Sequence, residues 1–382
     1  MKRKPNRKVA VAITVCLAML VGCGIAADGE QGPPGVGIDY IVNNGDGTFK
    51  LYLTDGYSYT VGNFTGPQGN PGPRGNPGPQ GPQGLPGLGY NPSQIALLRW
   101  FEANQAGFAF SVGVSPYGVC YDGANIWVAN SGDDNVIKLR VSDGSPVGTY
   151  AAGSNPLGIC FDGANIWVTN EFSLTVTKLK ASDGSLVGTY AVGVYPGDIC
   201  FDGANIWVAN FGGGGTVTKL KASDGSLVGT YAVGSGPFGI CFDGTNIWVA
   251  NWGSDDVTKL KASDGSLVGT YAVGSGSGPF DICFDGTNIW VIQQDGDTVT
   301  KLKASDGSLV GTYAVGEFPN GVCFDGANIW VTNENDDNVT KLKASDGSLV
   351  GTYAVGSDPF GICFDGANIW VTNQGSSTVI KL

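Results

Sequence analysis

The chain has 382 residues, 42% of them hydrophobic, which is enough for one large domain with accessory segments. Beyond residue 22 it carries sixteen basic and 33 acidic residues, a formal charge of −17 that argues against nucleic acid as a partner. Histidine is absent, so a catalytic site would have to use carboxylates, hydroxyls or thiols.

Residues 1–22 have the pattern of a secretory signal. Five basic residues lie within the first eight positions, and an apolar run too short to span a bilayer comfortably follows up to Val21. The run ends in Leu-Val-Gly-Cys at residues 20–23, which resembles the lipobox of bacterial lipoproteins. This resemblance implies a diacylglycerol on Cys23 and an exported protein held on a bacterial membrane, at the cell surface or facing the periplasm. An ordinary signal peptide that happens to contain a cysteine is the alternative.

Glycine at every third position marks a spacer. Residues 23–37 form a tether that begins this pattern, and residues 66–89 carry it without a break from Gly66 to Gly87. Only glycine fits at the axis of a collagen triple helix, so the segment resembles the collagen-like stalks of bacterial surface proteins and implies a homotrimer. A monomeric, extended polyproline-type linker is the alternative.

Two further segments flank the triplets. Residues 38–65 alternate polar and apolar positions around Asn- and Asp-Gly turns, which predicts a small β-meander of about three strands. Residues 90–106 form a linker in which Asn91-Pro92-Ser93 resembles a helix start and apolar residues follow at helical spacing.

Residues 107–382 contain seven copies of a repeat of about 40 residues. A cysteine precedes each repeated tryptophan by seven positions, and Asp-Gly turns separate short segments rich in β-branched residues. The pattern predicts an all-β fold, a seven-bladed β-propeller with four strands in each blade. The repeated tryptophans, which should pack between blades, are Trp127, Trp167, Trp207, Trp248, Trp290, Trp330 and Trp370.

The sequence Trp-Val-Thr-Asn at residues 167–170 resembles the motif of the YVTN-type propeller repeats, relatives of the NHL repeat. That resemblance implies the fold but little about function, because the family includes binding proteins and a few enzymes. The last copy ends at Leu382 after its third strand, and residues 110–113 align with residues 353–356. We therefore expect a closure in which the first strand completes the last blade. The seven cysteines of the repeat are expected to be buried free thiols.

Variation between copies collects in two sets of loops, those after the second strand and those before the innermost strand. Both should emerge on one face of a propeller, which predicts a binding surface on a rigid scaffold. The candidate binding residues on this face are Tyr117, Phe172, Tyr195, Phe211, Trp252, Phe280, Phe318 and Phe360. Weaker candidates for a metal site are Asp133, Asp134, Asp255, Asp256, Asp295, Asp297, Asp336 and Asp337.

The leading hypothesis is a surface-anchored adhesion or recognition protein that displays a binding face for a protein or a carbohydrate. The rival is a propeller enzyme resembling lyases or lactonases, with a divalent cation held by the loop carboxylates. The streptogramin lyases are propellers of this kind, but their chemistry relies on a histidine that this chain lacks. No cofactor is expected. Calcium-stiffened loops and plain solvated charge are further interpretations of the aspartates.

Overall fold

A computed structural model describes residues 38–43, 49–53, 58–61 and 108–382. The chain divides into two compact units, Met1–Leu88 and Gly89–Leu382. The expected export signal with Cys23, the collagen-like triplets and the helix near Asn91 lie outside the described residues. Within those ranges, no helix has the length and apolar character needed to cross a membrane.

The first unit contains a small antiparallel sheet. Its strands are β1 (Ile38–Asn43), β2 (Phe49–Leu53) and β3 (Ser58–Val61), in the order β1-β2-β3. The Lys50 ammonium lies 5.0 Å from the centroid of the Tyr52 ring. These three strands are the meander that the turn spacing predicts.

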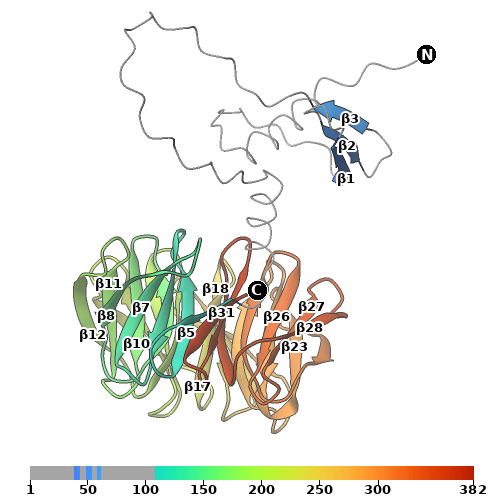
Figure 1. Cartoon of the computed structure of the whole chain (residues 1–382). Coiled ribbons are helices and arrows are strands. Elements are labelled where there is room, and N and C mark those ends of the chain that lie inside the picture. The colour runs from blue at the N-terminus through green and yellow to red at the C-terminus, as the bar shows by residue number, and fades with distance from the viewer. Residues whose placement is uncertain (1–37, 44–48, 54–57, 62–107) are drawn as a thin grey trace, which may run out of the picture. The chain divides into compact units, whose positions relative to one another are not determined.

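The second unit is a seven-bladed β-propeller, as predicted (Figure 1). Blade 2 shows the plan: β9 (Pro156–Phe161), β10 (Asn165–Asn170), β11 (Thr175–Lys180) and β12 (Leu186–Ala191) form one antiparallel sheet in sequence order. The innermost strands of consecutive blades lie side by side around a central channel. Tight Asp-Gly turns join the first strand to the second and the third to the fourth, and both turns place glycine at positive φ.

The other blades repeat this plan with little change. Blade 1 consists of β5 (Pro116–Tyr121), β6 (Asn125–Asn130), β7 (Asn135–Arg140) and β8 (Pro146–Ala151). Blade 3 consists of β13 (Pro196–Phe201), β14 (Asn205–Asn210), β15 (Thr216–Lys221) and β16 (Leu227–Ala232). Blade 4 consists of β17 (Pro237–Phe242), β18 (Asn246–Asn251), β19 (Asp256–Lys261) and β20 (Leu267–Ala272).

The remaining blades include the one short helix among the described residues. Blade 5 consists of β21 (Pro279–Phe284), β22 (Asn288–Gln293), the 3-10 helix η1 (Gln294–Gly296), β23 (Thr298–Lys303) and β24 (Leu309–Ala314). Blade 6 consists of β25 (Pro319–Phe324), β26 (Asn328–Asn333), β27 (Asn338–Lys343) and β28 (Leu349–Ala354). Blade 7 consists of β29 (Pro359–Phe364), β30 (Ile369–Asn373), β31 (Thr378–Lys381) and β4 (Phe108–Ser111).

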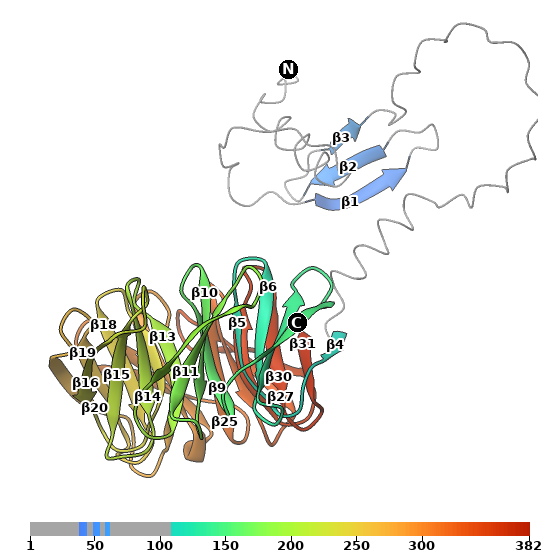
Figure 2. The same cartoon turned by 90° about the vertical axis from the view of Figure 1, so that its left-hand side faces the viewer.

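The strand β4 closes the ring by pairing with β31, which confirms the expected closure (Figure 2). Its Phe110 ring lies 5.7 Å from the Trp370 ring, where a tyrosine of the outermost strand contacts the tryptophan in the other blades. Across the seam, the Lys381 ammonium donates a hydrogen bond of 3.1 Å to the Val141 carbonyl oxygen in blade 1. This boundary therefore repeats the lysine–carbonyl contact found between five other pairs of neighbouring blades.

A tryptophan, an aspartate and a lysine connect neighbouring blades. In blade 3, the Trp207 Nε1–H donates to Asp202 at 2.7 Å, and the Lys219 ammonium lies 4.7 Å from the centroid of the Trp207 ring. The same ammonium donates to the carbonyl oxygen of Ala262 in blade 4 at 2.7 Å. Both side chains are buried, so the indole face and the carbonyl oxygen replace the water that the cation loses.

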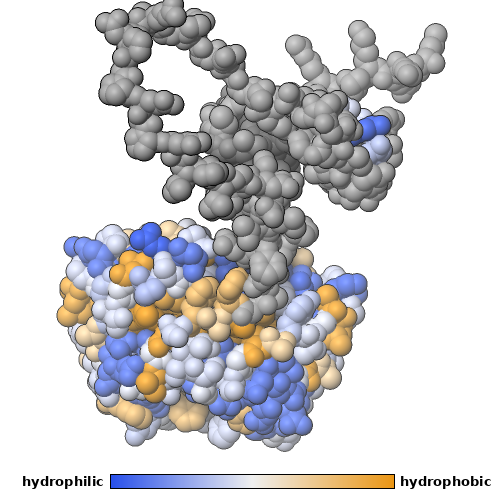
Figure 3. All heavy atoms as spheres, viewed as in Figure 1, coloured by the Kyte–Doolittle hydropathy of each residue, from blue (hydrophilic) through white to orange (hydrophobic). Residues whose placement is uncertain are grey.

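The outermost strands expose apolar side chains. Leu186 and its equivalents in four other blades are about two-thirds exposed, and a half-exposed valine follows each of them. On the side of the propeller shown in Figure 3, such apolar residues alternate with polar ones. Single exposed leucines of this kind are normal on a protein surface.

The seven cysteines of the repeat are free, as expected. They are half-buried rather than fully buried, one in each innermost strand. Burial is the main cause that raises the pKa of each thiol, and nearby aspartates raise it further. At four of the thiols a neighbouring cysteine contributes as well, for example Cys241 to the pKa of Cys200. These thiols therefore remain protonated at neutral pH.

We expect Lys219→Met to lower the free energy of unfolding by about 2 kcal/mol, because it leaves the Ala262 and Ser263 carbonyl oxygens without their buried donor. Lys341→Met is the matched control. Its ammonium lies 4.0 Å from Asp325 of the same blade, and among the described residues no carbonyl oxygen of blade 7 accepts a hydrogen bond from it. Denaturant titration should show a smaller loss for Lys341→Met, and equal losses would contradict the assigned role.

Candidate pocket at the central channel

The two sets of variable loops lie on one face of the propeller, as predicted. In blade 3, the backbone N–H of Phe211 donates to the Tyr195 carbonyl oxygen at 2.9 Å, and that of Gly212 donates to Val194 at 3.0 Å. Such bonds join the loop after the second strand to the loop before the innermost strand in every blade. We call the face that these loops form the variable face.

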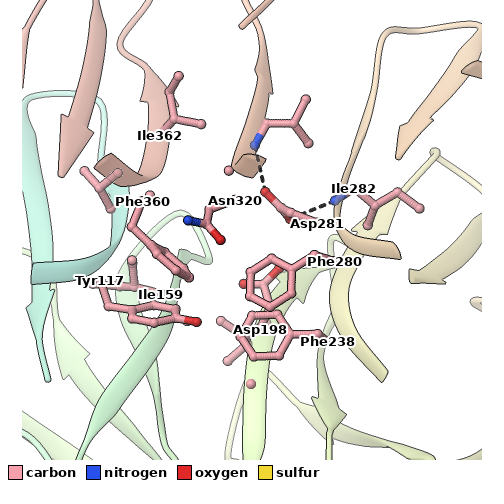
Figure 4. Close-up of a pocket in the computed structure, with 18 residues that line it drawn as sticks. Tyr117, Ile159, Asp198, Phe238, Phe280, Asp281, Ile282, Asn320, Phe360 and Ile362 are labelled. Carbon is pink, nitrogen blue, oxygen red and sulfur yellow. Dashed lines mark hydrogen bonds between the residues drawn. The ribbon is translucent and has the colours of Figure 1, made fainter. Parts of the chain in front are cut away.

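A pocket of about 230 Å³ lies in the central channel. The innermost strands of all seven blades contribute to its wall with residues from their second to fourth positions, and blade 4 contributes only Phe238. Figure 4 shows aromatic rings, two aspartates and an asparagine around it. The polar and aromatic residues that line it are Tyr117, Asp198, Phe238, Phe280, Asp281, Asn320 and Phe360. Glycine, isoleucine and valine of the same strands complete the wall.

Four aromatic rings occupy the second position of the innermost strands and form two contacting pairs. The centroids of Tyr117 and Phe360 are 3.9 Å apart, and those of Phe238 and Phe280 are 4.1 Å apart. Between the pairs, Tyr117 lies 6.4 Å from Phe238 and Phe280 lies 5.8 Å from Phe360. Gly197 makes room for this arrangement, since a Cβ there would lie 3.2 Å from the Phe238 ring.

Glycine is the usual residue at the third position, because the next blade's backbone lies close. A Cβ on Gly361 would lie 2.2 Å from the Tyr117 carbonyl oxygen. The glycines at this position are Gly118, Gly158, Gly239, Gly321 and Gly361. Blades 3 and 5 instead carry Asp198 and Asp281, so two carboxyl groups enter the channel where the other blades have no side chain.

Each of the two aspartates reaches toward the following blade. Asp281 accepts hydrogen bonds of 2.8 Å from its neighbour Ile282 N–H and from Val322 N–H in blade 6. Asp198 accepts a bond of 3.3 Å from Ile240 N–H in blade 4. Both side chains are half-buried, with part of each accessible from the channel.

Burial raises the pKa of Asp198 to about 6. Burial, together with the charge of Asp198, raises the pKa of Asp281 to about 8. Near neutral pH, Asp281 is therefore protonated for most of the time while Asp198 is mostly ionised. A proton donor and a proton acceptor thus lie in one pocket.

Threonines fix the backbone of two aromatic residues. Thr372 donates a hydrogen bond of 2.7 Å to the Tyr117 carbonyl oxygen across the seam, and Thr332 donates one of 2.7 Å to that of Phe360. Each threonine hydroxyl also accepts a bond of 2.8 Å from a glycine N–H of its own blade. This side of the pocket is therefore held rigidly between blades.

The pocket lies in a region of negative potential. Burial and then the charges of four carboxylates raise the pKa of the Tyr117 hydroxyl, and these carboxylates are Asp198, Glu171, Asp281 and Glu334. Asn320 connects the pocket to one of them, because its amide donates to Glu334 at 2.5 Å and accepts from Gln294 at 2.6 Å. No lysine or arginine is among the described residues that line the pocket.

The structure separates the predicted aromatic residues into three groups. Tyr117, Phe280 and Phe360 line the pocket. Phe211 and Trp252 form a row of rings beside the pocket, because the Phe211 ring lies 6.3 Å from the Phe238 ring of the pocket and 6.3 Å from the Trp252 ring. Phe172 and Tyr195 are exposed on the variable face, and Phe318 is half-buried there.

Two of these aromatic residues have an unusual backbone. Tyr195 has φ +50° and Phe318 has φ +55°, at a position where other blades carry Ser, Asn, Gly or Asp. A bulky side chain at positive φ costs about 1 to 3 kcal/mol, so it persists where the surroundings or a function require it.

The loop aspartates named as metal candidates bond to backbone N–H groups. Asp255 accepts from Gly276, Ser277 and Gly278, and the same position in other blades, filled by Asp134, Asp297 and Asp337, accepts from the following blade in the same way. These four residues have positive φ, which aspartate tolerates well.

Other loop aspartates also have partners within the protein. Asp133 and Asp336 accept from backbone N–H groups, and Asp256 accepts from the Asn251 amide. Asp295 lies near Gly278, close enough that a Cβ there would meet its carboxylate. The described residues contain no group of three or more ligands placed to hold a metal ion. The calcium site stays a prediction.

Sequence reasoning missed Asp198, Asp281, Phe238 and Asn320. The two aspartates could have been found from the innermost strand, because two copies of the repeat have aspartate where the other five have glycine. The loops, which differ in length between copies, were more conspicuous. This third position of the innermost strand directly follows the second position, where Tyr117, Phe280 and Phe360 were identified. A comparison of the copies position by position would have found both aspartates.

No family model matches the sequence, and no curated protein matches it. The fold resembles that of streptogramin B lyase, with a TM-score of 0.63 and 18% identity over 72% of this chain and 95% of that one. It also resembles virginiamycin B lyase from Staphylococcus aureus, in a catalytically inactive histidine-to-alanine variant with quinupristin, at a TM-score of 0.63 and 18% identity over 72% and 97% of the two chains.

Hydrazine synthase from Kuenenia stuttgartiensis is similar to the same degree, with a TM-score of 0.62 and 17% identity over 73% of this chain and 98% of that one. At such identities the likeness shows the fold alone.

The raised pKa values of the two aspartates predict a pH dependence of stability. The ordinary pKa of aspartate is about 3.9, so the folded protein binds these protons more tightly than the unfolded chain does. Their contribution to stability is complete below about pH 4 and is lost as the pH rises through 6 and then 8.

Asp281→Gly, which restores the residue of the other blades, should therefore reduce the fall in unfolding free energy between pH 5 and pH 8 by roughly 1 to 4 kcal/mol. Urea titrations at each pH measure it. In the matched variant Asp198→Gly, the difference in unfolding free energy from the wild type should stop changing once the pH has risen past about 6. A pH dependence unchanged in both variants would show that the two carboxyl groups titrate normally.

Proposed function

We propose that this protein binds a ligand in the channel pocket and displays that pocket from a bacterial membrane. The convergence of four aromatic rings and two carboxyl groups from blades 1, 3, 4, 5 and 7 carries the proposal. These positions differ between copies that are otherwise almost identical, and concave, mostly apolar pockets with a few polar groups are typical of ligand sites.

The variable face extends the site. Trp252 and Phe211 are each about 40% exposed, and the Phe211 ring connects them to the pocket, because it lies 6.3 Å from both the Phe238 ring and the Trp252 ring. Exposed aromatic side chains of this kind bind proteins and carbohydrates. The backbone strain at Tyr195 and Phe318 is consistent with residues retained for binding rather than for stability. A larger ligand would insert one group into the pocket and rest on this surface.

The way the propeller is displayed rests on the sequence. A lipid on Cys23 would hold the protein on a membrane, and the triplets of residues 66–89 would carry the propeller outward. If the triplets form a triple helix, three propellers act together, and weak contacts at each pocket add to a tight attachment. This arrangement suits adhesion or recognition.

Replacing an aromatic ring of the pocket should weaken ligand binding. We expect a screen of the full-length protein against a glycan array and a small-molecule set, read by melting temperature, to yield a ligand. Phe238→Leu and Phe280→Leu should then lower its affinity by about fivefold, since an aromatic contact contributes about 1 kcal/mol. Leucine already occupies this position as Leu157, so the blades should still fold.

The control is Leu227→Ser on the exposed outermost strand, which should leave the affinity unchanged. A ligand whose affinity is the same in both phenylalanine variants binds elsewhere, and this result would refute the pocket as the binding site.

Lipid attachment is tested separately. Expressed in bacteria that process lipoproteins and fed a palmitate analogue, the wild type should be labelled and recovered with membranes, because acyl chains supply the anchor. Cys23→Ala should lose both label and membrane association. A Cys23→Ala protein that stays labelled would place the lipid on another residue, and a wild type that stays unlabelled would remove the anchor.

A second candidate function is enzymatic. The observation in its favour is the pair of carboxyl groups with separated pKa values, which could serve as proton donor and acceptor in one pocket. The similar lyases are propellers as well, but the inactive variant lacks a histidine and this chain has none. Turnover of a bound compound, with a rate that depends on pH and is lost in Asp281→Gly, would favour this function over binding.

A further inference from the structure

We infer that the group bound in the channel pocket is a small organic cation, of the methylated ammonium class, placed against the aromatic rings and above the two aspartates. The inference rests on the proposed function and names the chemistry of its ligand. Three observations on the described residues support it: the charge of the pocket, the arrangement of its rings, and the hydrogen bonds that its carboxyl groups already make.

The charge of the pocket lacks a counter-ion. Asp198 and Asp281 lie within it, and Glu171 and Glu334 act on the same Tyr117 hydroxyl from the loops around it. The residues that line the pocket include no basic side chain. An ionised carboxylate surrounded by protein is costly unless an opposite charge pairs with it. A bound cation would supply that charge, whereas an anionic ligand would be repelled.

The aromatic rings suit a cation as well. The two pairs of rings lie next to each other, with the Tyr117 and Phe238 centroids 6.4 Å apart at 51° and the Phe280 and Phe360 centroids 5.8 Å apart, edge to face, at 83°. A cation beside these rings lies within about 6 Å of more than one centroid, which is the range of cation–π attraction. The chain uses the same interaction in its own core, where each repeated tryptophan carries a lysine ammonium.

The hydrogen bonds of the carboxyl groups favour a methylated ammonium over a primary amine. Both oxygens of Asp281 accept backbone N–H donors, from Ile282 and Val322, and Asp198 accepts one from Ile240. Because these carboxyl oxygens already accept hydrogen bonds from the backbone, they attract a ligand by their charge more than by accepting further hydrogen bonds from it. A methylated ammonium needs charge and apolar contact but few hydrogen bonds. The volume of about 230 Å³ suits a small head group rather than an oligosaccharide.

Choline and its uncharged isostere 3,3-dimethyl-1-butanol test the inference, because they share shape and differ in charge. Calorimetric titration of the full-length protein should show choline binding at least about tenfold more tightly than the alcohol, a difference of about 1.4 kcal/mol. The affinity for choline should rise between pH 6 and pH 8, as Asp198 and then Asp281 lose their protons. Binding should release protons in this range.

Variants separate charge from shape. Asp198→Gly and Asp281→Gly restore the common residue of the repeat and should each weaken choline binding about tenfold while leaving the alcohol unaffected. Phe238→Leu and Phe280→Leu should weaken both compounds. The control Leu227→Ser should change neither.

The outcomes distinguish this inference from the function on which it rests. Equal affinity for choline and the alcohol, or no binding of choline at millimolar concentration, would contradict the inference that the ligand is a cation. If the phenylalanine variants still weaken an uncharged ligand found by screening, the pocket remains the binding site and only its ligand class is wrong. A ligand that is insensitive to every pocket variant overturns both.

Discussion

The lysine that joins a blade to the next, at six of the seven blade boundaries, is the contact on which this structure depends. Lys219 loses its water in the core and regains contacts from the Trp207 face and the Ala262 carbonyl oxygen, which belong to two different blades. Because donor and acceptor come from consecutive blades, these blades do not supply the carbonyl partner of their own lysine. Lys341 is the exception, since its ammonium lies near Asp325 of the same blade. The last lysine is satisfied only through the seam, where Lys381 reaches Val141. Neighbouring blades therefore stabilise one another, and closing the ring contributes to the stability of the whole propeller.

Because the contacts of tryptophan, aspartate and lysine hold the blades in place, a few residues of the innermost strands, which line the central channel, can differ between copies. The pocket needs only the second and third residues of the innermost strands, which the framework brings together from distant parts of the sequence. Thr372 and Tyr117, for example, are 255 positions apart and hydrogen-bonded. A change of one residue in one copy, such as glycine to Asp281, alters the chemistry at the centre without touching the contacts between tryptophan, aspartate and lysine. Repetition supplies the scaffold, and departures from it supply the site.

The repeat predicted the ring well because its signals are local and periodic. The spacing of the tryptophans determined the number of blades, and the likeness of Phe110 to Tyr353 located the seam. The site was harder to predict. The raised pKa values of Asp198 and Asp281 arise from burial in the channel and from their proximity, neither of which the sequence displays. The conspicuous loop aspartates, such as Asp255, instead hold neighbouring loops together through backbone N–H groups, a role that depends on local φ angles.

The position of β4 has a mechanical consequence. This strand completes the last blade, and it is also where the propeller joins the preceding chain. In a protein held by its N-terminal side, a pull on a bound ligand would be transmitted to the ring through Phe108. Only four residue pairs join β4 to β31, whereas covalent turns connect the strands inside the other blades. These four pairs would then bear the same load as the contacts to the ligand, and the attachment could not withstand a greater force than they can.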